Sequence, residues 1–172
     1  MIGKSTTQLV LGVFFEHPSK EFHLRELSRL LKLSIPTIIS ATDTLAKERL
    51  ILKTKGKVIT KVTANRENEE FIRHKRLYNL EKIYDSGIID YLSKTYHHPK
   101  SIILFGSYSR GDDIDSSDID IAISTKKKLS LDLVRYEGIL KRGVHIHETD
   151  LDKISKEFKA NLANGIVLEG SW

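Results

Sequence analysis

Acids and isoleucines alternate in one short run of the sequence, and this alternation constrains the fold more than any other feature. The run reads Ser117-Asp118-Ile119-Asp120-Ile121-Ala122-Ile123. Successive side chains of a β-strand point to opposite faces, so Asp118 and Asp120 are expected on one face and the isoleucines on the other. The run therefore predicts a sheet with one buried face and one face that carries two carboxylates.

Length and composition limit the class of protein. The chain has 172 residues, enough for one ordinary domain or two small ones, and it is 40% hydrophobic and 30% charged. This balance excludes a disordered or fibrous chain. The longest apolar run, 9–15, is too short for a membrane span, and no signal peptide is evident, so we expect a cytoplasmic protein without a membrane partner. The chain has no cysteine, so any metal must be bound by carboxylates or histidines.

The net charge of +5 is concentrated in the N-terminal third. Residues 1–65 contain eleven lysines and arginines against five acids, whereas the remainder carries seventeen basic and eighteen acidic residues. Such an asymmetry favours a module that binds a polyanion, joined to a module of another kind. A solvated lysine-rich face is the alternative interpretation.

Residues 1–65 are predicted to form three helices and a hairpin. The helices cover 6–15, the amphipathic stretch 24–31, and a segment from Ser34 to Lys47 in which Ser34 caps the helix and Ile35, Ile38, Ile39 and Leu45 are buried. Two β-prone runs, 50–53 and 57–62, are joined across a turn that contains Gly56.

This order of elements resembles the winged helix-turn-helix family. The resemblance implies that the third helix enters the major groove of double-stranded DNA and that lysines of the hairpin contact phosphates. The implied DNA-binding residues are Thr37, Ser40, Ala41, Thr44, Lys47, Lys53, Lys55 and Lys57. Winged helices also serve as adaptors between proteins, so DNA binding is one of two readings.

Residues 66–98 are predicted to form a helical linker, with helices on either side of Asp85-Ser86-Gly87. The linker is expected to pack on one or both modules, and a homodimer contact is the alternative.

A glycine-serine turn precedes the aspartates. The apolar strand 101–105 stops at Gly106-Ser107, where a glycine lets the backbone approach a ligand and a serine offers a hydroxyl. Two converging carboxylates form half of a site for Mg²⁺ or Mn²⁺, and phosphate oxygens commonly complete such a site. The combination predicts a substrate that bears phosphates.

Gly106, Ser107, Arg110 and Gly111, followed by 117–121, resemble the GSxxRG and SDIDI motifs of the minimal nucleotidyltransferases in the DNA polymerase β-like superfamily. The resemblance covers residues 99–170, and 165–170 is also similar to an ending found in that branch. It implies that Asp118 and Asp120 bind Mg²⁺ bridged to a nucleoside triphosphate, while Gly106 and Ser107 hold its phosphates. Arg110 either adds positive charge there or pairs with the loop acids Asp112, Asp113 and Asp115, which are expected to be solvated.

Enzymes of this family usually carry a third acid on a neighbouring strand. The matching strand here is 143–148, in which His145 and His147 are expected to face the aspartates and Glu148 to face away. Imidazole can accept a proton near neutral pH but binds Mg²⁺ less well than a carboxylate does. His145 and His147 are therefore candidate catalytic residues, or they line a polar cleft.

Two further helices are predicted at 129–141 and 151–162, the second capped by Asp150. The predicted class is α+β, with a winged-helix domain at 1–65, a helical linker at 66–98 and a small mixed-sheet nucleotidyltransferase domain at 99–172. The leading hypothesis is an enzyme that moves a nucleoside monophosphate onto a hydroxyl, such as that of a partner toxin protein. The alternative is a DNA-binding regulator whose second domain senses a nucleotide or binds a partner without turnover.

Overall fold

The computed structural model describes residues 5–56, 59–151 and 153–171, and it divides the chain into two compact units, Met1–Lys75 and Arg76–Trp172. The division falls inside helix α4 (Glu69–Ser86). The units differ in extent from the three predicted segments, because residues 66–98 are shared between them. Within the described ranges, no helix has both the length and the apolar character needed to cross a membrane.

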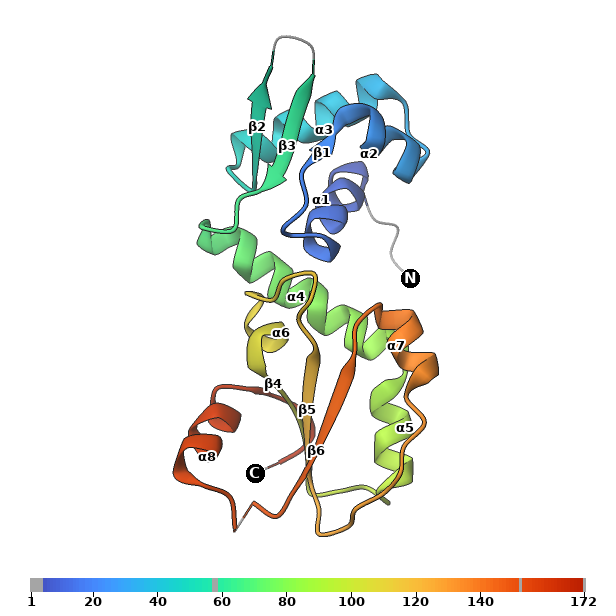
Figure 1. Cartoon of the computed structure of the whole chain (residues 1–172), viewed down its shortest axis with the longest axis vertical. Coiled ribbons are helices and arrows are strands. Elements are labelled where there is room, and N and C mark those ends of the chain that lie inside the picture. Colours follow the sequence, from blue (N-terminus) through green and yellow to red (C-terminus); the bar gives the residue numbers. More distant parts are fainter. Residues whose placement is uncertain (1–4, 57–58, 152, 172) are drawn as a thin grey trace. The chain divides into compact units, whose positions relative to one another are not determined.

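Before the start of α4, the first unit contains the helices α1, α2 and α3 and a small antiparallel sheet (Figure 1). The elements are α1 (Thr6–Glu16), β1 (Phe22–His23), α2 (Leu24–Leu31), α3 (Ile35–Lys47), β2 (Ile51–Lys55) and β3 (Thr60–Ala64). The strand order is β1-β3-β2. Ser5 closes a capping box at the start of α1, and the hydroxyl of Ser34 accepts a hydrogen bond from the Thr37 amide at the start of α3.

One face of α3 packs into the core, and it agrees with the predicted face only in part. The buried side chains are Ile38, Ala41, Thr42 and Leu45, which recur at i, i+3, i+4 and i+7. Ile39 was expected to be buried but is 39% exposed, and Ala41 was expected to be open but is 4% exposed. Ile38 and Leu45 are buried as predicted, so the error concerns Ile39 and Ala41 at the edges of the buried stripe.

The second unit contains a four-stranded mixed sheet with helices on both faces (Figure 1). Its elements after α4 are α5 (Ile88–Thr95), β4 (Ser101–Phe105), α6 (Gly106–Arg110), β5 (Ile119–Ser124), α7 (Val134–Leu140), β6 (Val144–Thr149), α8 (Lys156–Ala163) and β7 (Ile166–Gly170). The strand order is β6-β5-β4-β7; β4 is antiparallel to β5 and β7, and β5 is parallel to β6.

The larger core lies on one face of this sheet, where Ile102, Leu104, Ile119, Ile121 and Ile123 pack against the second half of α4 and against α5 and α7. The other face has a smaller cluster around Ile103, Phe105, Ala122 and Leu162, beneath α8. The alternation of acids and isoleucines thus has the predicted consequence: the isoleucines of β5 fill the main core, and its polar side chains are left on the opposite face.

Several boundaries differ from those predicted. Helix α7 begins at Val134 instead of residue 129, and α8 begins at Lys156, where Ser155 and not Asp150 accepts the capping hydrogen bond, from the Phe158 amide. The run 166–170 is a fourth strand, β7, which pairs with β4. Helix α5 contributes Ile88, Ile89 and Leu92 to the main core, so this part of the predicted linker is integral to the second unit.

Candidate active site

Asp118 and Asp120 lie on the face of the sheet opposite the main core. Asp118 directly precedes β5 and Asp120 is its second residue, and their side chains are 48% and 30% exposed. Ile119 and Ile121 between and after them are fully buried on the other side. The two carboxylates therefore share a partly solvated face, as the alternation predicts.

A glycine packs against each carboxylate. Helix α6 begins at Gly106 directly after β4, and Gly106 has a φ of +76°, which L-residues rarely adopt. A Cβ atom at this position would lie 2.7 Å from Asp120 Oδ2. Gly106 thus allows the strand-to-helix turn to contact the carboxylate directly, with the Ser107 backbone following in the same short helix.

Gly143 has the corresponding position beside the other aspartate. A Cβ atom on Gly143 would lie 2.5 Å from Asp118 Oδ1. Sequence reasoning did not single out this glycine; its only signal was its place just before β6. Any larger residue at 143 would displace the Asp118 carboxylate.

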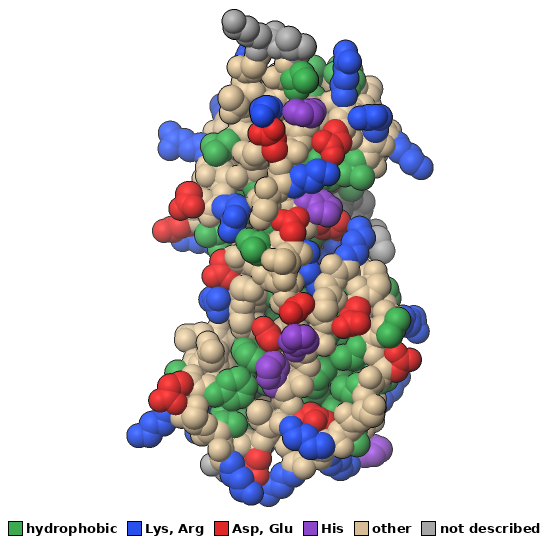
Figure 2. Space-filling model, viewed as in Figure 1, with side chains coloured by type: hydrophobic (Ala, Val, Ile, Leu, Met, Phe, Trp, Pro, Cys, Tyr) green, Lys and Arg blue, Asp and Glu red, His purple; other side chains and the backbone are tan. Residues whose placement is uncertain are grey.

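The two histidines of β6 each contact one of the aspartates. In the parallel pairing of β5 with β6, Asp120 is opposite His145 and Ala122 is opposite His147. Nε2 of His147 lies 3.1 Å from Asp120 Oδ1, and Nε2 of His145 lies 3.7 Å from Asp118 Oδ2. Figure 2 shows histidine side chains beside acidic ones on this face. The structure therefore brings together the four residues that the sequence placed on one face.

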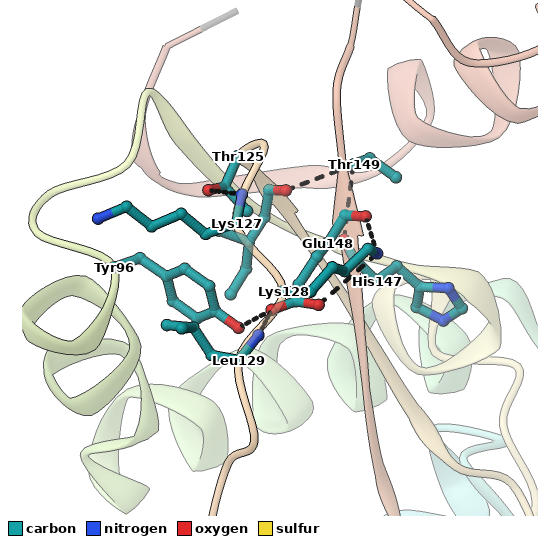
Figure 3. Close-up of polar contacts among 9 residues, drawn as sticks. Tyr96, Thr125, Lys127, Lys128, Leu129, His147, Glu148 and Thr149 are labelled. Atoms are coloured by element: carbon teal, nitrogen blue, oxygen red, sulfur yellow. Dashed lines mark hydrogen bonds and ion pairs between the residues drawn. The ribbon is translucent and has the colours of Figure 1, made fainter.

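Glu148 lies on the opposite side of β6 from His147, and other groups bind its side chain (Figure 3). Its Oε1 accepts hydrogen bonds from the Tyr96 hydroxyl at 2.6 Å and from the Leu129 amide at 2.7 Å, and Lys128 Nζ donates to its backbone carbonyl. Burial, followed by the bond to the Glu148 carboxylate, raises the pKa of Tyr96 far above its usual value. Glu148 is thus a structural group, and the β6 side chains that contact the aspartates are His145 and His147.

The loop between α6 and β5 is partly buried, which corrects the prediction that all its acids are solvated. Arg110 Nε donates to Asp112 Oδ2 at 3.1 Å, so the structure shows the pairing alternative for Arg110. Asp113 is 2% exposed and accepts a hydrogen bond from Asn79 Nδ2 at 2.7 Å, and Asn79 also donates to the Tyr108 carbonyl. Helix α4 thereby holds the loop that connects Gly106 to the aspartates.

The donor set fits a divalent cation only in part. Asp118 and Asp120 offer the hard oxygen ligands that Mg²⁺ prefers. Across the described residues, no group of three or more histidines, aspartates or glutamates is placed to hold a metal ion. Substrate oxygens and water would have to complete the coordination.

The first unit presents a second candidate surface, on the exposed side of α3. Pro36, Ile39, Ser40, Asp43, Thr44 and Lys47 line a shallow groove there. Thr37 lies near the cap, where its hydroxyl is hydrogen-bonded to Ser34 Oγ. Of the predicted DNA-binding residues, Ser40, Thr44, Lys47 and Lys55 are exposed.

Two of the predicted DNA-binding residues do not have the expected orientation. Ala41 is buried in the core, and the side chain of Lys53 is only 10% exposed because its Nζ pairs with Asp43 Oδ1 at 2.7 Å and donates to Thr42 Oγ1. Lys53 therefore links the hairpin to α3 and is not a free cation. Lys57 lies outside the described residues.

Comparison with known families supports the class of the second unit. Residues 87–171 match the family described as Polymerase beta, Nucleotidyltransferase, and the match includes all four strands of the mixed sheet and both aspartates. The small mixed sheet fits a domain of the nucleotidyltransferase type, and the family supports transfer of a nucleotidyl group as its chemistry. No curated protein and no solved structure was found to match the chain.

Proposed function

We propose that the second unit transfers a nucleoside monophosphate from a nucleoside triphosphate to a hydroxyl acceptor. The observation that carries this proposal is the placement of Asp118 and Asp120 on one face of β5, against the Gly106 turn, within the span that matches the nucleotidyltransferase family. In a domain with a purely structural role, two partly exposed acids on one strand would serve no purpose. The close contact between one of them and Gly106 would not be needed either.

Asp118 and Asp120 would hold Mg²⁺ or Mn²⁺, which when bound neutralises charge on the triphosphate. The turn at Gly106 and the hydroxyl of Ser107 would bind the β- and γ-phosphates, since small side chains at the start of α6 let phosphate oxygens approach the backbone amides. Arg110, held by Asp112, remains within the same turn and adds positive charge near this end of the site.

In the reaction, the acceptor oxygen attacks the α-phosphorus in line with the bond to the bridging oxygen. A new oxygen–phosphorus bond forms, the bond to the bridging oxygen breaks, and pyrophosphate leaves. The hydroxyl proton passes to a base, and the imidazoles of His147 and His145 are the nearest groups on β6 that can accept it. Positioning and charge stabilisation supply most of the rate.

The second candidate function is a regulator that binds a nucleotide or a partner without turnover. The pairing of each aspartate with a histidine favours it, as does the commitment of Glu148 to the opposite face, because neither leaves a third carboxylate beside Asp120.

For the first unit we infer a winged-helix domain that binds double-stranded DNA. Its order of helices and hairpin supports this inference, as do the exposed Ser40, Thr44 and Lys47 on α3 and the exposed Lys55 at the end of β2. A DNA-binding domain fused to a transferase would allow the protein both to modify a partner and to regulate its own gene. The acceptor would then be a protein hydroxyl, and a homodimer would match a two-fold DNA site.

One experiment separates the two candidate functions. The full chain is incubated with each of the four α-labelled nucleoside triphosphates and Mg²⁺, with and without a lysate as the source of acceptor. Transfer of label to an acceptor, lost in Asp118→Asn and Asp120→Asn, supports the enzyme. Tight nucleotide binding without labelled product supports a regulator that senses a nucleotide. Absence of both nucleotide binding and product contradicts the enzyme and the nucleotide-sensing regulator, and it leaves a regulator that binds a partner.

A further inference from the structure

The aspartate face of the sheet has an apolar half that adjoins the polar half. Leu162 and the partly buried Phe158 of α8 pack with Phe105 of β4 and Ala122 of β5, on the face that carries Asp120 and His147. Apolar side chains accordingly border the histidines in Figure 2. The proposed phosphate site therefore lies next to a surface that contains aromatic side chains.

Three aromatic rings from three different elements meet at this border. Phe105 and His147 have ring centroids 5.0 Å apart and nearly perpendicular, and Phe105 and Phe158 have centroids 5.5 Å apart with the same edge-on arrangement. His147 and Phe158 lie 6.1 Å apart at 46°. Phe105 is 6% exposed and contacts the other two rings, whereas His147 and Phe158 are only partly buried.

We propose that Phe158, together with the ring of His147, forms a stacking subsite for the base of the nucleoside triphosphate. The inference rests on the proposed function, because it places the base of that substrate beside the aspartates. Phe105 directly precedes Gly106 in the chain, and His147 contacts Asp120. The aromatic cluster therefore adjoins the proposed phosphate site at two points. A nucleotide whose phosphates lie at the Gly106 turn can therefore reach the ring surface with its base.

The subsite would bind the flat face of a base by stacking, and it would not recognise the hydrogen-bonding edge of the base. A base stacked on an aromatic ring gains about 1–3 kcal/mol, which corresponds to about 5- to 150-fold in affinity. Every base has such a ring face, so the preference depends on ring area. The subsite thus favours purine over pyrimidine triphosphates. It contributes to binding of the base and leaves binding of the phosphates unchanged.

The test compares a nucleotide with a ligand that lacks the base. Affinities of ATP, CTP and inorganic tripolyphosphate are measured by calorimetry in the presence of Mg²⁺, for the full chain and for Phe158→Leu, Phe158→Trp and Ile154→Val. Phe158→Leu keeps an apolar side chain under α8 but removes the ring, and Phe158→Trp keeps a ring. Ile154→Val is the matched control, since Ile154 belongs to the same cluster and has no ring.

We expect Phe158→Leu to weaken ATP binding by about 5- to 100-fold and CTP binding by less, with tripolyphosphate binding unchanged. Phe158→Trp should bind ATP at least as tightly as the unchanged protein, and Ile154→Val should bind it normally. Equal losses for ATP and tripolyphosphate, no loss for either, or the same loss in Ile154→Val overturn the subsite and show the rings to be packing alone. Those results leave the proposed function standing if ATP still depends on Asp118 and Asp120. Failure of the unchanged protein to bind any triphosphate overturns both.

Discussion

The imidazole of His147 and the carboxylate of Asp120 form a direct polar contact, with Nε2 3.1 Å from Oδ1. The contact joins β6 to β5 on the face that carries both aspartates. It places an imidazole, and not a further carboxylate, beside Asp120, so the side chain at position 147 should influence how well the site holds a cation.

Replacing His147 by glutamate should strengthen the dependence on Mg²⁺. His147→Glu adds a third negative charge close to Asp120, so we expect the metal-free protein to lose about 1 kcal/mol of stability. Mg²⁺ should restore that loss, and it should raise the Tm of this variant more than that of His147→Gln, the neutral control. Thermal unfolding with and without Mg²⁺ measures the difference, and equal shifts in the two variants would show that residue 147 does not face the metal.

Gly106→Ala should damage the site more than the fold. The new methyl group would lie 2.7 Å from Asp120 Oδ2 and would force an alanine to a φ of +76°. We expect a loss of about 1–3 kcal/mol in stability and of about 100-fold in nucleotide affinity or turnover, because the carboxylate must move.

Gly138 in α7 provides the matched control for this substitution. A Cβ atom there has no neighbour within 4 Å, and the position lies within a helix. Gly138→Ala should therefore raise stability by about 0.5–1 kcal/mol and leave nucleotide affinity unchanged. Equal behaviour of the two variants in urea unfolding and nucleotide binding would contradict the role of Gly106.

The contact between Tyr96 and Glu148 predicts the behaviour of the protein in alkali. Burial and the neighbouring carboxylate raise the pKa of the Tyr96 phenol above its ordinary value of 10.0, so the folded state retains this proton after the unfolded state loses it. The resulting stability is fully present below about pH 10 and declines as the pH rises above that value. Absorbance at alkaline pH should show the ionisation of Tyr96 as a late step.

Tyr96→Phe should remove the late ionisation and lower stability at neutral pH by about 1–2 kcal/mol, because a hydrogen bond to a carboxylate is lost. Tyr91→Phe is the control, since the ring of Tyr91 stacks on Tyr136 and its removal should leave the late step in place. Loss of the late step in Tyr91→Phe instead would contradict the assignment.

The lysines of the first unit should separate into two groups when DNA binding is measured. Lys47 and Lys55 are exposed, so replacing either by alanine should weaken binding at all sequences and lower the salt slope by about one. Lys53→Ala should mainly lower the Tm, because the Lys53 side chain joins β2 to Asp43 of α3. Binding that is indifferent to salt, or to both exposed lysines, would contradict the proposed DNA surface.

The sequence predicted the parts of the fold that depend on local patterns. The alternation at 118–123 fixes which face of β5 is buried, and Ser34 marks the start of α3 because its hydroxyl caps the Thr37 amide. The same alternation on β6 placed His145 and His147 beside the aspartates. These features follow from strand and cap geometry and need no knowledge of tertiary contacts.

What the sequence did not predict depends on long-range packing. Ala41 of α3 was expected on the open face but is buried, because its small side chain does not reveal the tertiary contacts that cover it. Asp113 was expected in solvent, but Asn79, 34 residues earlier, binds it. Gly143 and the strand β7 were missed for the same reason. Gly143 has its role because it packs against Asp118, and β7 forms because it pairs with β4, and local patterns specify neither contact.

Release of pyrophosphate from nucleoside triphosphates in the presence of Mg²⁺ is the measurement that tests the role of Asp118 and Asp120 without an intermediate step. We expect release by the unchanged protein once its acceptor is supplied, and a loss of at least about 100-fold in both Asp118→Asn and Asp120→Asn, while Asp112→Asn on the exposed loop retains activity. Unaltered release in the two aspartate variants, or equal losses in all three, would contradict the assignment of this pair as the catalytic carboxylates.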